Sequence, residues 1–240
     1  CFSLEFGRTS MSDARNDILG NIRTAISKDI DDSLDPFKRN LLEAKDRLSY
    51  HPVNLIPARG NLGQKARVDL FIREAERVNA TVSRVSCLAG VPREIVRFLT
   101  NNNLSMTLKI SPEISEKKIP WAKNPLLKVE KVGLDGTDDS YVSNAFAAVA
   151  ETGTLVALSG QSRSTSHNFL PRCHVCLLNY SDIVGAYEEV WAQLRNNKKE
   201  QDNFSFLPRT VNWITGPSRT ADIEQTILLG AHGPQRLHIV

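Results

Sequence analysis

Segments with a helical period alternate with short β-rich runs through most of this chain. Apolar residues at helical spacing begin the pattern: Val68, Phe71, Ile72, Ala75 and Val78. The β-branched run 81–85 follows them, Pro92 suits the first turn of the next helix, and 105–110 is the next predicted strand. This alternation predicts an α/β fold of three layers, in which helices cover both faces of a mostly parallel sheet.

The second half of the chain continues the alternation. The segments 140–150 and 220–229 are predicted helices, and another is predicted from Ser181 or Asp182 onward. The remaining predicted strands are 154–159, 174–179, 211–215 and 237–240. Prolines make 111–131 a predicted loop with short strands. Because ligands bind beyond the carboxyl ends of the strands in such sheets, the strand-to-loop junctions are the first places to look for a site.

The first sixty residues differ from this pattern. Residues 1–10 have no helical or strand period and precede Met11, so we expect them to be disordered or foreign to the natural protein. Isoleucines spaced four residues apart after Met11 predict an amphipathic helix, and 37–48 predicts a second helix. We therefore expect a helical appendage over 11–60 and one α/β domain over 61–240.

Composition argues against several classes of function. The chain has 30 Lys and Arg against 27 Asp and Glu, and its basic residues are scattered rather than gathered into a stripe, so no nucleic-acid partner is implied. No apolar run approaches the length that a membrane span needs, and no signal-peptide pattern begins the chain, so we expect a cytoplasmic protein. The four cysteines are too few and too unevenly placed for a disulfide framework, so we expect reduced thiols.

The first motif that could carry chemistry is Ala-Glu-Thr-Gly-Thr-Leu at 150–155. A carboxylate beside an apolar strand is costly to bury without a partner. Glu151 is therefore a candidate catalytic residue, as a general base or a nucleophile. The alternative is a structural acid that bonds backbone amides in the turn at Gly153. The candidate ligand-binding residues of this motif are Thr152, Gly153 and Thr154.

A second motif occupies 214–224, where a predicted strand, a glycine turn and a predicted helix start follow one another. Backbone amides at that helix N-terminus, with two hydroxyls and one guanidinium nearby, would hold a small carboxylate or a phosphorylated ligand. Two acids in the first turn would oppose a multiply charged phosphate, and simple capping by Ser218 or Thr220 is the alternative. The candidate ligand-binding residues are Gly216, Pro217, Ser218, Arg219, Thr220, Asp222 and Glu224.

Two histidines are further candidate catalytic residues, because imidazole exchanges protons near neutral pH. His232 follows the second motif, and it either reaches the same strand-end cleft or is an exposed loop residue without a ligand. His174 begins a predicted strand, and it either faces the cleft or is a buried core histidine. We do not interpret Cys173 and Cys176 as a metal site, because side chains three apart on a strand point to opposite faces.

Taken together, these motifs resemble the LUD domain family, also called the YkgG family, to which lactate utilization protein C belongs. The resemblance rests on 150–155, on 168–171 with His174, and on 214–234, which occur in the family's order. It covers about 138–240. The sequence departs from the family pattern at the two residues between Pro171 and His174, an arginine and a cysteine.

The resemblance implies a fold similar to that of sugar-phosphate isomerases and coenzyme A transferases (NagB/RpiA/CoA transferase-like). It also implies a part in the oxidation of L-lactate to pyruvate, as an accessory or substrate-binding subunit that binds no cofactor itself. The iron-sulfur clusters would belong to partner proteins similar to lactate utilization proteins A and B. The sequence lacks the run of closely spaced cysteines that such a cluster needs. The alternative is an independent enzyme that acts through Glu151 on an acyl or phosphorylated small molecule.

Overall fold

The chain divides into two units, Cys1–Asn54 and Leu55–Val240. The computed structural model describes residues 11–26, 36–50, 55–114, 118–131, 140–161, 163–196, 207–223, 226–230 and 232–240. In the first unit it describes the helices α1 (Met11–Ile26) and α2 (Pro36–Ser49), where the sequence predicts helices. The segment 1–10, for which the sequence predicts disorder or a foreign origin, lies outside the described residues.

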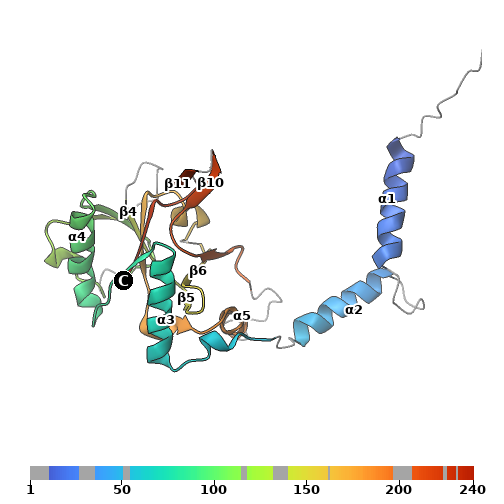
Figure 1. Cartoon of the computed structure of the whole chain (residues 1–240), viewed down its shortest axis with the longest axis horizontal. Helices are drawn as coiled ribbons and strands as arrows, with labels where there is room; N and C mark the ends of the chain where they lie inside the picture. Colours follow the sequence, from blue (N-terminus) through green and yellow to red (C-terminus); the bar gives the residue numbers. More distant parts are fainter. Residues whose placement is uncertain are drawn as a thin grey trace, which may run out of the picture. The chain divides into compact units, whose positions relative to one another are not determined.

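The main sheet of the second unit has six parallel strands (Figure 1). Their order is β1 (Thr81–Val82), β12 (Arg236–Ile239), β7 (Cys173–Leu177), β4 (Ser140–Asn144), β2 (Thr107–Ile110) and β3 (Lys128–Glu130). Every neighbouring pair is parallel, so all the carboxyl ends lie at one edge of the sheet. The prediction of a mostly parallel sheet is confirmed.

Helix α4 (Val91–Asn101) covers one face of this sheet. Its apolar residues recur at helical spacing, and a proline occupies its first turn, where a missing amide hydrogen costs nothing. Ile95 and Leu99 are fully buried in one cluster with Leu108 and Val142 of the sheet. Burying such a side chain contributes about 1.5–3 kcal/mol, so this stripe fixes the helix to the sheet.

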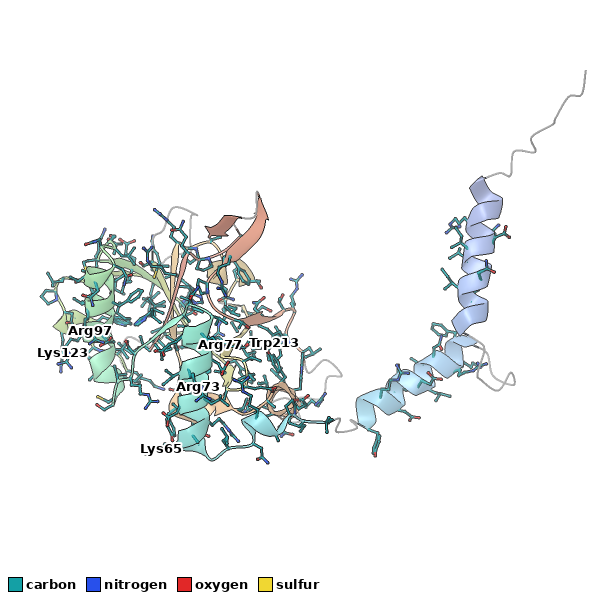
Figure 2. The ribbon with its side chains drawn as sticks, in the orientation of Figure 1. Lys65, Arg73, Arg77, Arg97, Lys123 and Trp213 are labelled. Carbon is teal, nitrogen blue, oxygen red and sulfur yellow. The ribbon has the colours of Figure 1, made fainter. Side chains whose placement is uncertain are left out.

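The opposite face is covered by α3 (Gln64–Arg77) together with a second sheet. Phe71 of α3 shares a buried cluster with Leu155 of the second sheet and Ile239 of the first. The outward face of α3 carries exposed charges, of which Lys65 and Arg77 are labelled in Figure 2. Helices therefore lie on both faces of the main sheet, as the sequence predicts.

The second sheet has four strands in the order β8 (Ile183–Val184), β5 (Ala147–Val149), β6 (Thr154–Leu158) and β9 (Val211–Ile214). One of its faces belongs to the cluster with α3, and its other face packs against α5 (Tyr187–Asn196). Val190 and Leu194 of α5 are buried there with Val156 of β6. Alternate residues of β5 and β6 thus serve two different cores, which explains why both strands are apolar apart from Thr154 at the start of β6.

The remaining described elements are a hairpin and several short 3₁₀ turns. The hairpin consists of β10 (Arg219–Ile223) and β11 (Thr226–Leu229). The 3₁₀ turns are η1 (Ala58–Gly60), η2 (Leu88–Gly90), η3 (Trp121–Lys123), η4 (Thr165–Asn168) and η5 (Tyr180–Asp182). Among the described helices, none combines the length and apolar character needed to cross a membrane.

Two predicted helices are wrong. The segment 140–150 forms strands β4 and β5. The prediction missed β4 because this strand is buried on both faces and so lacks the alternation of apolar and polar residues by which a strand is recognised. The segment 220–229 forms the β10–β11 hairpin. Its β-branched residues favour strand, and the glycine turn and acids that imitate a helix start do not outweigh them.

Candidate functional site

A cavity of about 660 Å³ lies at the carboxyl ends of the parallel strands β1, β12, β7, β4 and β2. Its apolar walls include Phe71 of α3 and Ile239 of β12. Its polar groups come from the residues that follow the strands, among them Ser83, Asn144 and Asn179. A mostly apolar concave site with a few convergent polar groups is the usual form of a small-molecule site. We call this cavity the strand-end cavity.

The strand-end cavity includes a topological switch point. After β2 the chain passes to the α4 side of the sheet, where Ile114 and Ile119 are buried. After the neighbouring strand β4 it passes to the other side, where Ala148 of β5 is buried with α3. Diverging connections leave a crevice between adjacent strand ends, which is where open α/β sheets bind their ligands.

A second cavity, of about 620 Å³, adjoins the first. Glu113, after β2, and Ala145, after β4, line both cavities. Arg163 lines the second cavity and forms a bidentate ion pair with Glu113, with 2.7 Å between its Nε and Glu113 Oε2. The side chains of Arg163 and Glu113 are 15% and 25% exposed, so this pair is partly shielded from water, although Glu113 as a whole residue is exposed.

A row of polar side chains lies on the sheet beside this ion pair. The Ser143 hydroxyl lies 2.8 Å from His174 Nε2, and the Tyr141 hydroxyl lies 3.2 Å from His167 Nδ1. His174 is 1% exposed, and burial lowers the pKa of its imidazole to about 4. Burial also raises the pKa of the Tyr141 hydroxyl. His174 is thus neutral near pH 7, and it lies within the interior rather than in either cavity.

The predicted residues of the first motif form a hydroxyl cluster instead of lining a cavity. The Thr154 hydroxyl lies 2.7 Å from that of Thr152, 3.1 Å from that of Tyr187 and 2.7 Å from that of Thr215. The last contact joins the first motif to Thr215 of the second motif. Thr154 has no exposed surface, so this network holds the β5–β6 turn against β9.

Glu151 and Gly153 complete that turn. The backbone N–H of Glu151 donates to the carbonyl of Gly185, at 3.2 Å. Glu151 is half-buried and lines neither of the two cavities. Gly153 has a positive φ of 66° and packs directly on the backbone of α3. The backbone of Glu151 thus helps to hold this turn, and both interpretations of its carboxylate, catalytic and structural, stay open.

The second motif does not begin a helix, so the helix N-terminus that we predict as an anion cradle does not form. Gly216, at a φ of 73°, packs on Val78, and Pro217 is buried beside it. Arg219 and Thr220 begin β10, while Asp222 also belongs to that strand. Glu224 lies outside the described residues.

His232 and Ser218 are brought together by the loops beside the hairpin. The backbone N–H of His232 donates to the Ser218 hydroxyl at 3.3 Å, and Ser218 donates its own N–H to the Pro234 carbonyl at 2.8 Å. These residues precede β12, so they lie by the amino-terminal edge of the parallel sheet. The strand-end cavity is at the opposite edge, so the predicted residues lie outside it. The two motifs nevertheless meet each other, because Gly153 packs on Ala75 and Gly216 packs on Val78, both at the end of α3.

The residues that line the strand-end cavity were not among the predicted site residues. Some of them follow predicted strands, where ligands of such sheets are expected to bind. Asn179 ends a predicted strand, and Ser83 lies within another. Asn144 was hidden in the segment predicted as a helix. Glu113 lies in the proline-containing loop, where no periodic pattern marks the end of β2.

The two cysteines of the Cys-His-Val-Cys segment point to opposite faces of β7. Cys173 is buried in the cluster with α4, and Cys176 is buried in the cluster with α3. Burial raises the pKa of the Cys176 thiol to about 12. These two thiols therefore cannot bind one metal ion or cluster. Within the described ranges, no group of three or more His, Cys, Asp or Glu side chains is placed to hold a metal ion.

Several curated relatives of the chain share a name. Lactate utilization protein C of a Geobacillus strain is 30% identical over 105 residues, which are 43% of this chain and 42% of that protein. The protein of the same name from Halalkalibacterium halodurans is 34% identical over 98 residues, 41% of each chain. An uncharacterized protein of Neisseria meningitidis is 34% identical over 102 residues. The matches thus span about two fifths of the length of these relatives.

Comparison with solved structures supports the fold. A crystal structure of a DUF162 family protein from Deinococcus radiodurans has a TM-score of 0.53 and 18% identity, and covers 74% of this chain and 97% of that chain. The model of the LUD domain matches residues 68–240, which is more than half of the chain and includes both motifs and the strand-end cavity. The resemblance seen in the sequence is confirmed: this chain belongs to the LUD domain family.

Proposed function

We propose that the chain is a component of L-lactate oxidation to pyruvate and that it binds a small carboxylate ligand in the strand-end cavity. It acts as an accessory or substrate-binding subunit beside iron-sulfur partners similar to lactate utilization proteins A and B. The single observation that carries the binding role is the cavity at the switch point between β2 and β4. The names of its relatives support the metabolic role.

The size and lining of the cavity support ligand binding. Its volume of about 660 Å³ falls within the range of roughly 300–1,000 Å³ that small-molecule sites occupy. Hydrogen-bonding groups of Ser83, Asn144 and Asn179 lie among apolar walls, where a hydrogen bond to a ligand is less weakened by water. Glu151, on which the alternative function depends, lines neither of the two cavities described above.

The redox step is assigned to the partners. Oxidation of L-lactate to pyruvate removes two electrons and two protons, which require an acceptor. Cys173 and Cys176 face opposite sides of β7 and so do not fit a shared cluster. In the proposed complex, the clusters of the partner proteins take the electrons. This chain holds or presents the ligand.

Reconstitution tests the proposal. The full chain is mixed with the A-like and B-like iron-sulfur proteins, and L-lactate-dependent reduction of an electron-accepting dye is measured with and without it. We expect stable association of the proteins and a rate that depends on this chain. Failure to associate at micromolar concentrations, or a rate that is the same without this chain, would contradict the proposal.

A cavity-filling variant tests whether the strand-end cavity is the site. Ser86 is exposed and lines the cavity, whereas Ala89 is exposed three residues further on and does not line it. We expect Ser86→Trp to lower the L-lactate-dependent rate at least tenfold, while the matched control Ala89→Trp keeps the wild-type rate. Equal rates in the two variants would remove the cavity from the proposal.

A further inference from the structure

The Arg163–Glu113 ion pair is the most enclosed charged group at the edge of the two cavities. Arg163 donates from Nε to Glu113 Oε2 at 2.7 Å, and its Nη2 pairs with the other carboxylate oxygen. Its Nη1 reaches the carbonyl of Leu158 at 3.4 Å. Two backbone hydrogen bonds with Gly160, of 3.0 and 3.2 Å, hold Arg163 in place. The guanidinium is thus fixed in position and presents a planar edge.

That planar edge matches the geometry of a carboxylate. A guanidinium binds a carboxylate through two parallel N–H···O bonds, a geometry that a lysine cannot provide. Glu113 shows that a carboxylate fits at this place, because both of its oxygens are engaged there. The guanidinium also has more N–H donors than these contacts use. A ligand carboxylate would find the same donors if the Glu113 side chain moved aside.

Glu113 is positioned to control access between the two cavities. It lines both of them, whereas Arg163 lines only the second. It follows β2 at the switch point, in a turn where the Ile114 N–H donates to the Ser111 carbonyl at 2.9 Å. With its side chain one quarter exposed, Glu113 is less enclosed than Arg163. Glu113 is therefore the member of the pair that can exchange its partner for solvent.

We propose that Arg163 binds the carboxylate of the ligand and that Glu113 occupies this position until the ligand displaces it. This inference rests on the proposed ligand-binding role and places the anion-recognising residue in the second cavity, which Glu113 and Ala145 connect with the strand-end cavity. The free ligand competes with an internal carboxylate. Its apparent affinity is therefore the intrinsic affinity multiplied by the fraction of molecules in which Glu113 has left Arg163. Removal of Glu113 should strengthen ligand binding, and removal of Arg163 should abolish it.

Binding measurements on the purified full chain test this assignment. Calorimetric titrations with L-lactate, pyruvate and inorganic phosphate are carried out on the wild type, Glu113→Gln and Arg163→Gln. We expect Glu113→Gln to bind L-lactate or pyruvate about tenfold more tightly than the wild type, a difference of about 1.4 kcal/mol. We expect Arg163→Gln to lose binding. Phosphate binding that is stronger than carboxylate binding would overturn the choice of a carboxylate ligand.

The matched control breaks another carboxylate ion pair. Glu130 pairs with Lys128 Nζ at 2.8 Å on β3, and neither residue lines either of the two cavities. Glu130→Gln should leave binding unchanged. Arg163→Lys keeps the positive charge but loses the planar edge, so it separates loss of recognition from loss of folding. We expect its thermal unfolding to show a folded protein, and we expect it to bind the ligand at least tenfold more weakly than the wild type. Equal affinities of wild type, Glu113→Gln and Arg163→Lys would overturn the inference.

The inference and the proposed function fail in different experiments. If none of the three probes binds the wild type or Glu113→Gln, Arg163 is not a carboxylate site, whatever the reconstituted complex does. If the probes bind as expected but the chain does not associate with the iron-sulfur partners, Arg163 retains its assignment and the lactate-oxidation role is lost.

Discussion

Replacing Gly153 by alanine should be among the most destabilising single changes in this protein. Gly153 has a φ of 66°, which costs an L-residue with a side chain roughly 1–2 kcal/mol. An added Cβ would fall on the backbone nitrogen of Ala75 and within 2.6 Å of the carbonyl carbon of Glu74. Both atoms belong to the backbone of α3, so neither can rotate out of the way.

The magnitude follows from these two contributions. Overpacking of a close contact costs about 1–3 kcal/mol, and the backbone conformation adds its own cost, so we expect the free energy of unfolding to fall by about 2–5 kcal/mol in total. Domains of this kind are stable by only roughly 5–15 kcal/mol. Gly153→Ala should therefore lower the urea midpoint strongly or prevent folding.

Urea denaturation followed by circular dichroism measures this change. The matched control is Gly160→Ala, because an added Cβ at Gly160 meets nothing within 4 Å and its φ is not in the left-handed region. We expect the control to stay within about 0.5 kcal/mol of the wild type. A Gly153→Ala protein that unfolds within about 0.5 kcal/mol of the wild type would refute the close packing of the turn on α3.

Two further predictions concern buried titratable groups. Burial lowers the pKa of His174 and of His238 to about 4, below the value of about 6.5 in the unfolded chain. Between these two values the unfolded chain binds more protons than the folded protein. The free energy of unfolding therefore falls by about 1.4 kcal/mol per pH unit for each histidine as the pH drops from 6.5 towards 4. His238→Asn should reduce the difference in the free energy of unfolding between pH 7 and pH 5, measured by urea unfolding, by roughly 2 kcal/mol, and an unchanged difference would contradict it. In the native protein at pH 8, iodoacetamide should label the exposed Cys87, while Cys176, whose thiol pKa burial raises to about 12, should be labelled only after unfolding. Peptide mass spectrometry measures both rates, and equal labelling would show that β7 is not buried.

The sequence predicted the elements whose signals are local. The stripe of Val68, Phe71 and Ala75 forms α3, and that of Ile95 and Leu99 forms α4, because helical spacing creates an apolar face before any tertiary contact exists. The opposite directions of Cys173 and Cys176 followed from the strand period in the same way. The family resemblance also came from short contiguous motifs.

Predictions failed where neighbours in space outweighed local pattern. Residues 140–150 contain small apolar residues without alternation. Only the position of β4 between β2 and β7, and of β5 between β8 and β6, makes them strands. Residues 220–229 have acids and a glycine turn in the positions of a helix start, but Thr220 and Ile223 pair with β11 instead. In 140–150 the strands pair with strands that are distant in the chain, which a local period does not specify. In 220–229 the pairing is local, between the two arms of one hairpin.

The sequence alone determined the α/β class, the helices that cover the parallel sheet and the membership of the LUD domain family. The tertiary structure decided the strand order β1-β12-β7-β4-β2-β3, and with it the place where chemistry can occur. Glu113 and Arg163 are 50 residues apart in the chain and meet only because β2 and β4 are neighbours whose connections diverge. Periodicity fixes which way a side chain points from its own element, whereas a cavity forms from elements that long-range pairing brings together.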